Sequence, residues 1–214
     1  MKKLTFSVVL LLCLGVAGYA IYSYGVLTPG ATVAPAMKSV YAAHRVRILA
    51  HVFCSVVALV TGPFQFLPAV RERRAIHRKI GYAYFSAVLF GGVTGLAMAF
   101  VAYGGLVSKL GFAVLALLWL YTGYRALLAV WERDYEDHRM WAIRCFALTF
   151  AAVTLRIYLG VFFALGLPFD SFYPALGWLC WVPNLLLVEW IILRPKKEPN
   201  QTPEPTAAAG RGSS

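Results

Sequence analysis

The sequence predicts an all-α integral membrane protein, a bundle of about six transmembrane helices with both chain ends in the cytoplasm. Hydrophobic residues make up 60% of the 214 residues and charged residues only 14%, and the mean hydropathy is +0.69. A soluble domain usually has about a quarter of its residues charged. The charges also gather in short clusters between apolar runs, and a run of about 20 apolar residues is enough to cross a bilayer.

The apolar runs place six predicted spans along the chain. They lie near residues 4–26, 45–68, 80–103, 109–130, 140–166 and 173–193. With the N-terminus inside, most of the 20 lysines and arginines fall at the chain ends or in cytoplasmic connections. The basic residues that fall outside are Lys38, Arg45, Arg47 and Lys109. This positive-inside asymmetry sets the orientation, so the net charge of +11 follows from topology and predicts no nucleic-acid partner.

Three regions follow from these spans. Residues 1–44 are predicted to be an N-terminal anchor helix, or a cleaved signal, followed by an outer loop; the length of the apolar run, to about Val26, favours the anchor. Residues 45–194 are predicted to form the transmembrane bundle. Residues 195–214, rich in Pro, Ala, Gly and Ser, are predicted to be a disordered cytoplasmic tail. We therefore expect a multi-pass membrane protein in contact with the lipid bilayer.

Two similar blocks suggest an internal repeat. Ala-Val-Arg-Glu-Arg at 69–73 precedes His77-Arg78, and Ala-Val-Trp-Glu-Arg at 129–133 precedes His138-Arg139. The blocks lie two predicted spans apart, so both are on the same side of the membrane, as a parallel repeat of helices two and three onto helices four and five requires. The alternative is a chance likeness between charged inner loops.

Ionisable residues stand on tracks of small and polar residues along three predicted helices. Such tracks let helices pack closely in lipid, and they could also leave a slot for a flat cofactor. His138 to Arg156 is about 27 Å of helix rise, which places Arg156 at the depth of His51 in the outer half of the membrane. An arginine in the hydrocarbon region costs at least about 2.5 kcal/mol and needs a partner, yet helices two to five carry no carboxylate at that depth.

A second group of residues gathers at the inner ends of the helices. It consists of His77-Arg78, His138-Arg139, Arg125, Arg144 and Gln65, with Glu189 as the expected counter-charge. Acids of the loop before helix five could instead cap that helix, and His138 could serve as an interface residue. The sequence has no nucleotide-binding loop, no GxSxG elbow and no HExxH motif, so hydrolase chemistry has no support.

The chain resembles an uncharacterised bacterial family of polytopic membrane proteins built around a domain of unknown function. The resemblance covers roughly residues 45–160 and is carried by His51, His77-Arg78, Gly81, His138-Arg139, Trp141, Arg144, the Gly-Pro-Phe-Gln-Phe run at 62–66 and the run from Ala147 to Arg156. This copy departs from the family at Lys79, where an aromatic is common, and at Cys145-Phe146, where Ser-Tyr is usual. The resemblance implies a polytopic fold in a bacterial inner (plasma) membrane and brings no established activity.

Three functions remain open from the residues. The first is a non-catalytic membrane module (a subunit, assembly factor or sensor) whose histidines make helix contacts with no cofactor bound. The second is a b-type haem protein that transfers electrons, with His77 and His138 as iron ligands and Arg78 and Arg139 on the haem propionates. In that case the pair of His51 and Arg156 could hold a quinone or the edge of a haem with a single protein ligand. The third is a small-molecule transporter, which lacks the mid-membrane carboxylates expected for proton coupling.

Overall fold

The computed structural model describes residues 3–192, and all regular structure in this range is helical. The elements are α1 (Lys3–Ile21), a π-helical turn (Tyr22–Val26), a 3₁₀ turn (Pro35–Met37), α2 (Lys38–Phe64), α3 (Pro68–Glu72), α4 (Arg74–Ala99), α5 (Gly105–Trp131), α6 (Tyr135–Thr149), α7 (Ala151–Ala164), α8 (Phe169–Leu179) and α9 (Val182–Ile192). The predicted tail, residues 195–214, lies outside the described residues.

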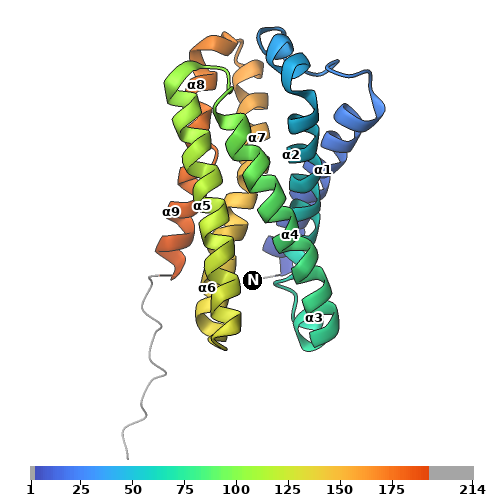
Figure 1. The fold of residues 1–214 in the computed structure, drawn as a ribbon, viewed down its shortest axis with the longest axis vertical. Helices are drawn as coiled ribbons and strands as arrows, with labels where there is room; N and C mark the ends of the chain where they lie inside the picture. Colours follow the sequence, from blue (N-terminus) through green and yellow to red (C-terminus); the bar gives the residue numbers. More distant parts are fainter. Residues whose placement is uncertain (1–2, 193–214) are drawn as a thin grey trace, which may run out of the picture.

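Six stretches of the described chain are long and apolar enough to cross a membrane, as predicted. They are Leu4–Val26, Pro35–Phe64, Arg74–Ala99, Gly105–Trp131, Tyr135–Ala164 and Phe169–Ile192. The helices stand side by side in a bundle, with α3 and the α5–α6 turn at one end (Figure 1). This end carries His77 and His138 and is predicted to be cytoplasmic; we call it the inner end, and the opposite one the outer end.

Several helix boundaries differ from the predicted spans. α2 begins at Lys38, so the outer loop predicted up to residue 44 is shorter, and α4 begins at Arg74 instead of residue 80. Lysine and arginine side chains can reach the aqueous interface from a helix end, so charged residues extend the helices beyond their apolar parts. α2 also ends at Phe64, before the end of its apolar run, because the chain turns into the short α3 that Pro68 begins.

Four helices form the centre of the molecule. α2 packs against α4, α4 against α5 and α5 against α6, while α2 and α6 touch over a short stretch, so α4 and α6 lie diagonally across the group. Buried residues of α4, α5 and α6 form its core, among them Tyr84, Val88, Trp119, Cys145 and Leu148. α1 covers α2 from outside through a smaller cluster around Cys13 and Leu59. Side chains at the inner ends of α4 and α6 therefore face the same interior.

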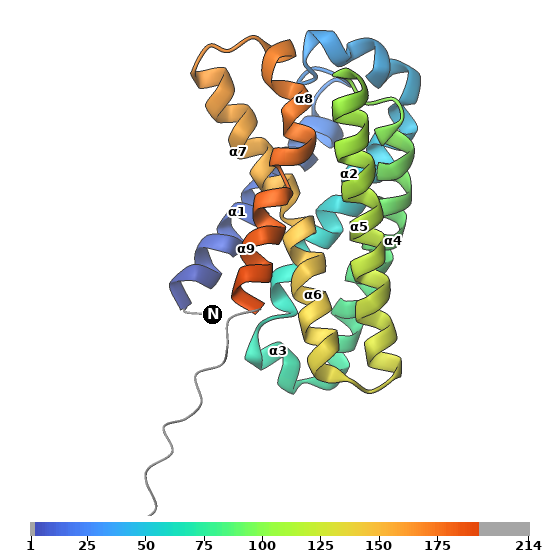
Figure 2. The same cartoon turned by 90° about the vertical axis from the view of Figure 1, so that its left-hand side faces the viewer.

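The fifth and sixth spans are broken near their middles, although the sequence predicted continuous helices. Phe150 separates α6 from α7, and Cys180 and Trp181 separate α8 from α9. α8 packs on α5 in the outer half, whereas α6 packs on α5 in the inner half with α9 beside it. The two spans thus cross (Figure 2), and each needs a bend where it passes the other.

Asn184 joins the two breaks. The two N–H groups of its side-chain amide donate to the carbonyl of Ala147 at 3.3 Å and to the carbonyl of Cys180 at 3.1 Å, and its Oδ1 accepts from the hydroxyl of Thr154 at 3.1 Å. A bend in a membrane helix frees backbone carbonyls that lipid cannot bond, so a polar side chain must take their place. Pro183 also lacks the N–H that would continue the helix across the second break.

Candidate functional site

The inner site is built from His77 in the first turn of α4 and His138 in the first turn of α6. Both side chains are half-buried. The two imidazoles lie close enough for the charge of one to act on the other. Since α4 and α6 are diagonal helices of the central group, the histidines approach each other from opposite sides of its interior.

A backbone hydrogen bond orients the ring of His138. Its Nδ1 lies 2.8 Å from the carbonyl oxygen of Ala126 on α5. A carbonyl can only accept, so Nδ1 carries the hydrogen and Nε2 of the neutral ring keeps its lone pair. Metal-binding histidines almost always donate their second ring nitrogen to such an acceptor. The neighbouring carboxylate of Asp137 does not bond this ring and instead accepts from Trp141 Nε1 at 3.1 Å.

His77 has a ring nitrogen without a partner. Its Nδ1 is buried and makes no hydrogen bond within the described residues, while its backbone carbonyl accepts from Gln65 Nε2 at 3.4 Å. A buried polar atom without a partner costs about 1–3 kcal/mol. One turn along α4, a Cβ added to Gly81 would meet the Gln65 amide only at 3.8 Å. The site thus combines a ring nitrogen of His77 that has no partner with an uncrowded position at Gly81.

Residues related by the predicted repeat meet across the interior. Tyr84 on α4 and Cys145 on α6 are 61 positions apart, and the tyrosine hydroxyl lies 3.4 Å from Cys145 Sγ. His77 and His138 have the same separation in sequence. Pairs of equivalent residues in contact are what a two-fold relation between α4 and α6 produces. The inner site therefore lies beside the axis that a parallel repeat would have.

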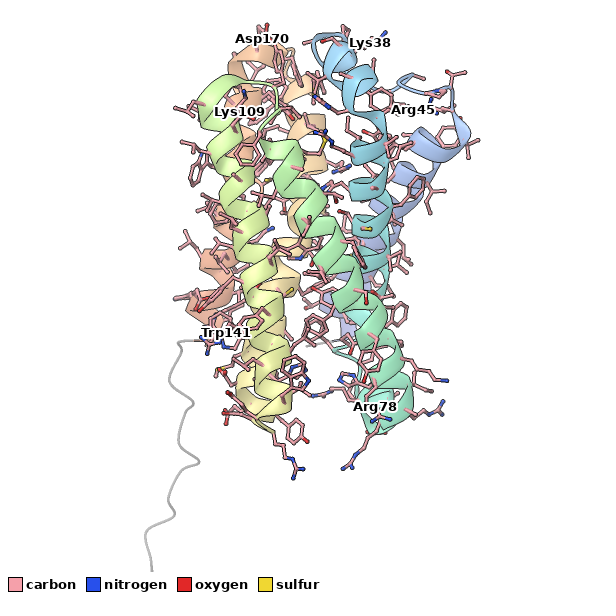
Figure 3. All side chains as sticks on the ribbon, viewed as in Figure 1. Lys38, Arg45, Arg78, Lys109, Trp141 and Asp170 are labelled. Carbon is pink, nitrogen blue, oxygen red and sulfur yellow. The ribbon has the colours of Figure 1, made fainter. Side chains whose placement is uncertain are left out.

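The arginines of the inner end divide into two groups. Arg78 and Arg139 are exposed beside the histidines, and Figure 3 shows Arg78 at the inner end of α4. Arg125 and Arg144, which the sequence grouped with the histidines, instead lie over the ring of Trp141 at 4.6 and 4.7 Å. Arg144 bonds Glu189 of α9 through two nitrogens, at 2.6 and 2.8 Å, which confirms Glu189 as a counter-charge.

The outer pair consists of His51 on α2 and Arg156 on α7. His51 Nδ1 lies 2.8 Å from the carbonyl of Gly91 on α4, so this ring too keeps a free Nε2. Gly95 makes room for the ring, because a Cβ there would lie 2.9 Å from His51 Cε1. Arg156 acts electrostatically on His51, Tyr24 and Tyr173.

Arg156 has no ion pair among the described residues. The ion pairs formed there are Arg125–Asp137 and Arg144–Glu189. Its Nη1 donates to the carbonyl of Ala152 one turn back at 3.3 Å. Asp170, in the first turn of α8 at the outer end, accepts from Tyr103 at 2.5 Å, and this bond raises the pKa of Tyr103, which lies between the spans. Arg156 is therefore a half-buried cation whose guanidinium has N–H groups that can donate to a further acceptor.

A buried polar network in the core was not recognised from the sequence. The hydroxyl of Thr149 accepts from Trp119 Nε1 at 2.9 Å, bonds Tyr84 at 2.8 Å and donates to the carbonyl of Cys145 at 3.0 Å. Tyr84 and Thr149 are polar residues of the third and fifth predicted spans, but Trp119 lies in an apolar run where an indole counts as hydrophobic. A tryptophan in the middle of a span is the signal that could have revealed it.

The chain matches the family described as predicted membrane protein (DUF2306) over residues 48–192, and it belongs to this family. This match extends the resemblance drawn from the sequence through the last span. A search of the curated proteins and one of the solved structures found no significant match.

Proposed function

We propose that this DUF2306 protein binds a b-type haem between His77 and His138 and transfers electrons within the membrane. The observation that carries the proposal is the pair of imidazoles on diagonal helices, one with its Nε2 left free by the Ala126 bond and one with a buried ring nitrogen that has no partner. A haem bound there would supply one-electron chemistry.

The donor set suits haem better than a bare metal ion. No group of three or more His, Cys, Asp or Glu side chains in the described chain could hold an ion. A structural zinc site uses four protein ligands, whereas a porphyrin supplies four nitrogens and needs axial ligands only. Arg78 and Arg139 are exposed next to the two histidines and are suited to bond propionate groups.

The experiment is an absorption spectrum of the purified full-length protein from cells supplied with a haem precursor. We expect a Soret band and, after reduction, an α-band. His77→Ala or His138→Ala should abolish the bound haem or convert it to high spin. His44→Ala, a histidine at the outer kink of α2, and Glu189→Gln should leave the inner-site spectrum in place. A wild-type protein without a Soret band would contradict the proposal.

For the outer pair we propose a quinone headgroup as ligand. His51 Nε2 can accept a hydrogen bond from a quinol hydroxyl, and Arg156 can donate to the second oxygen of the ring; its missing ion pair supports this assignment. Quinone extracted from the purified protein should fall several-fold in Arg156→Gln and stay unchanged in Arg47→Gln, an exposed arginine of α2. Equal quinone content in all three proteins would exclude this ligand.

The non-catalytic module is the second candidate function. It is favoured by the bonds of His51 to Gly91 and of His138 to Ala126, because each of them joins two helices and gives the histidine a packing role without a cofactor. Under this function the alanine variants lose stability and no chromophore is found. The helix breaks are the feature closest to a transporter, but Asn184 and the buried Cys180 and Trp181 fill them.

A further inference from the structure

Outer-side basic residues gather at one cavity. The cavity, of about 460 Å³, lies between the loop after α1 and the start of α2, and Lys38, Tyr41 and Arg45 of α2 line it together with the loop residues Thr28–Ala31. Lys38 and Arg45 are two of the four basic residues that the predicted topology places outside. The positive-inside preference makes such a concentration at one outer position unusual.

The two cations stand on either side of a kink in α2. Lys38 and Tyr41 precede His44, whose backbone angles are non-helical, and Arg45 follows it; Lys38, Tyr41 and Arg45 nevertheless line the same cavity. Figure 3 shows both on α2 at the outer end, near the loop from α1, with Lys109 on α5 across that end. Neither cation forms an ion pair within residues 3–192, and the cavity has no carboxylate in its lining.

The loop around Gly30 forms an ordered wall of the cavity. Gly30 has φ +83°, which favours glycine, and its chain folds back through bonds from Ala31 N–H to the Thr28 carbonyl and from Val33 N–H to the Gly30 carbonyl. A Cβ at Gly30 would lie 3.3 Å from the ring of Tyr41, which is itself buried beside Tyr24. The loop therefore packs closely on Tyr41 and forms one wall of the cavity.

We infer that this cavity binds the phosphate of an anionic phospholipid from the outer leaflet. Unpaired Lys and Arg with no competing acid fit a phosphate group. Exposed apolar side chains lie on the two segments that carry the cavity: Tyr22 and Val26, 55% and 69% exposed, precede its loop, and Val46, 81% exposed, follows Arg45. They offer a surface for the acyl chains, which a soluble anion would not use.

The test compares retained lipid by native mass spectrometry after incubation with phosphatidylglycerol or phosphatidylcholine. Wild type should retain one phosphatidylglycerol at least several-fold more strongly than phosphatidylcholine. Lys38→Gln with Arg45→Gln should abolish this preference, Lys109→Gln should keep it, and Lys38→Arg with Arg45→Lys should restore it in a protein of wild-type helical content. Equal retention of both lipids by wild type, or an equal loss in Lys109→Gln, would overturn the inference.

Inorganic phosphate separates the lipid from a soluble anion. Millimolar phosphate should neither displace the retained phosphatidylglycerol nor raise the melting temperature of wild type above that of the double glutamine variant. If phosphate does both, the ligand is a soluble anion and the lipid assignment is overturned. Haem content should be the same in all of these variants, because the cavity lies at the end of the bundle opposite to His77 and His138.

Discussion

Thr149 uses every hydrogen-bonding position of its hydroxyl. It donates to the carbonyl of Cys145 in its own helix, which leaves its two lone pairs for the N–H of Trp119 and the O–H of Tyr84. Three helices thereby meet at one oxygen atom that is almost fully buried. In lipid a polar group without a partner is costly, so a threonine that accepts from two buried donors stabilises the fold more than its small side chain would by packing alone.

Thr149→Val should lower the free energy of unfolding by about 1–3 kcal/mol, since the indole N–H and the phenol O–H lose their acceptor while the side-chain volume stays nearly constant. The measurement is the thermal unfolding of the purified protein, followed by tryptophan fluorescence. The control is Thr61→Val, whose hydroxyl bonds the Val57 carbonyl one turn back in α2. Equal losses in both variants would show that the network adds nothing.

Arg144 is held by geometry as well as charge. The guanidinium bonds both oxygens of Glu189 and also lies over the ring of Trp141. Arg144→Lys keeps the charge but loses the second bond and the stacking, so we expect a loss of about 1–2 kcal/mol, or about 2–8 °C in melting temperature. Arg139→Lys, on the exposed face of the same helix, should change neither. A melting temperature of Arg144→Lys equal to wild type would refute this role.

At the scale of the elements, the broken spans have different causes. Pro183 interrupts the backbone bonds between α8 and α9, a local effect that a sequence can reveal. Phe150, between α6 and α7, has neither proline nor glycine beside it. There the bend comes with the crossing of the two spans, and the amide of Asn184 bonds the carbonyl of Ala147 from outside the helix. One side chain on α9 thus supports both bends.

Asn184→Leu should destabilise the protein by about 1–3 kcal/mol, because leucine has a similar size but can neither donate to the carbonyls of Ala147 and Cys180 nor accept from Thr154. Chemical denaturation in detergent, followed by circular dichroism, measures the change. Leu187→Ala is the control, since this side chain is 55% exposed on the same helix. An Asn184→Leu protein as stable as wild type would mean that the crossing is held by packing alone.

At the scale of the whole molecule, the small residues determine how the helices approach. A Cβ on Gly111 of α5 would lie 2.6 Å from the backbone of Gly177 of α8. The two helices can approach this closely only because position 111 is glycine. Gly91 and Gly95 of α4 act in the same way, because they leave room for Trp119 of α5 and His51 of α2. These close contacts bring the polar side chains of different spans within bonding distance.

The orientation of the whole bundle is also testable. A single cysteine at position 132, in the turn between α5 and α6, should react with a membrane-impermeant maleimide only after the cells are opened, because the basic residues place this turn inside. The control is Ser171→Cys at the outer end, which should react in intact cells. Both positions are exposed. Labelling of position 132 in intact cells would reverse the orientation and exchange the inner and outer sites.

The sequence by itself determined the membrane class, the six spans, the predicted orientation and the repeat of the His-Arg blocks. These features rest on apolar length, charge placement and spacing, which are local properties of the chain. It also indicated Glu189 as a counter-charge, because a carboxylate near the inner end of an apolar helix needs a cation.

Only the tertiary structure decided which partners meet. The bonds of His51 to Gly91 and of His138 to Ala126, and the unpaired nitrogen of His77, depend on how helices distant in sequence are placed. The crossing of the last two spans and the place of Arg144 over Trp141 do so as well. The physical reason is that lipid favours no particular helix neighbour, so the pairing is selected by close packing and by polar groups that must be satisfied inside the protein.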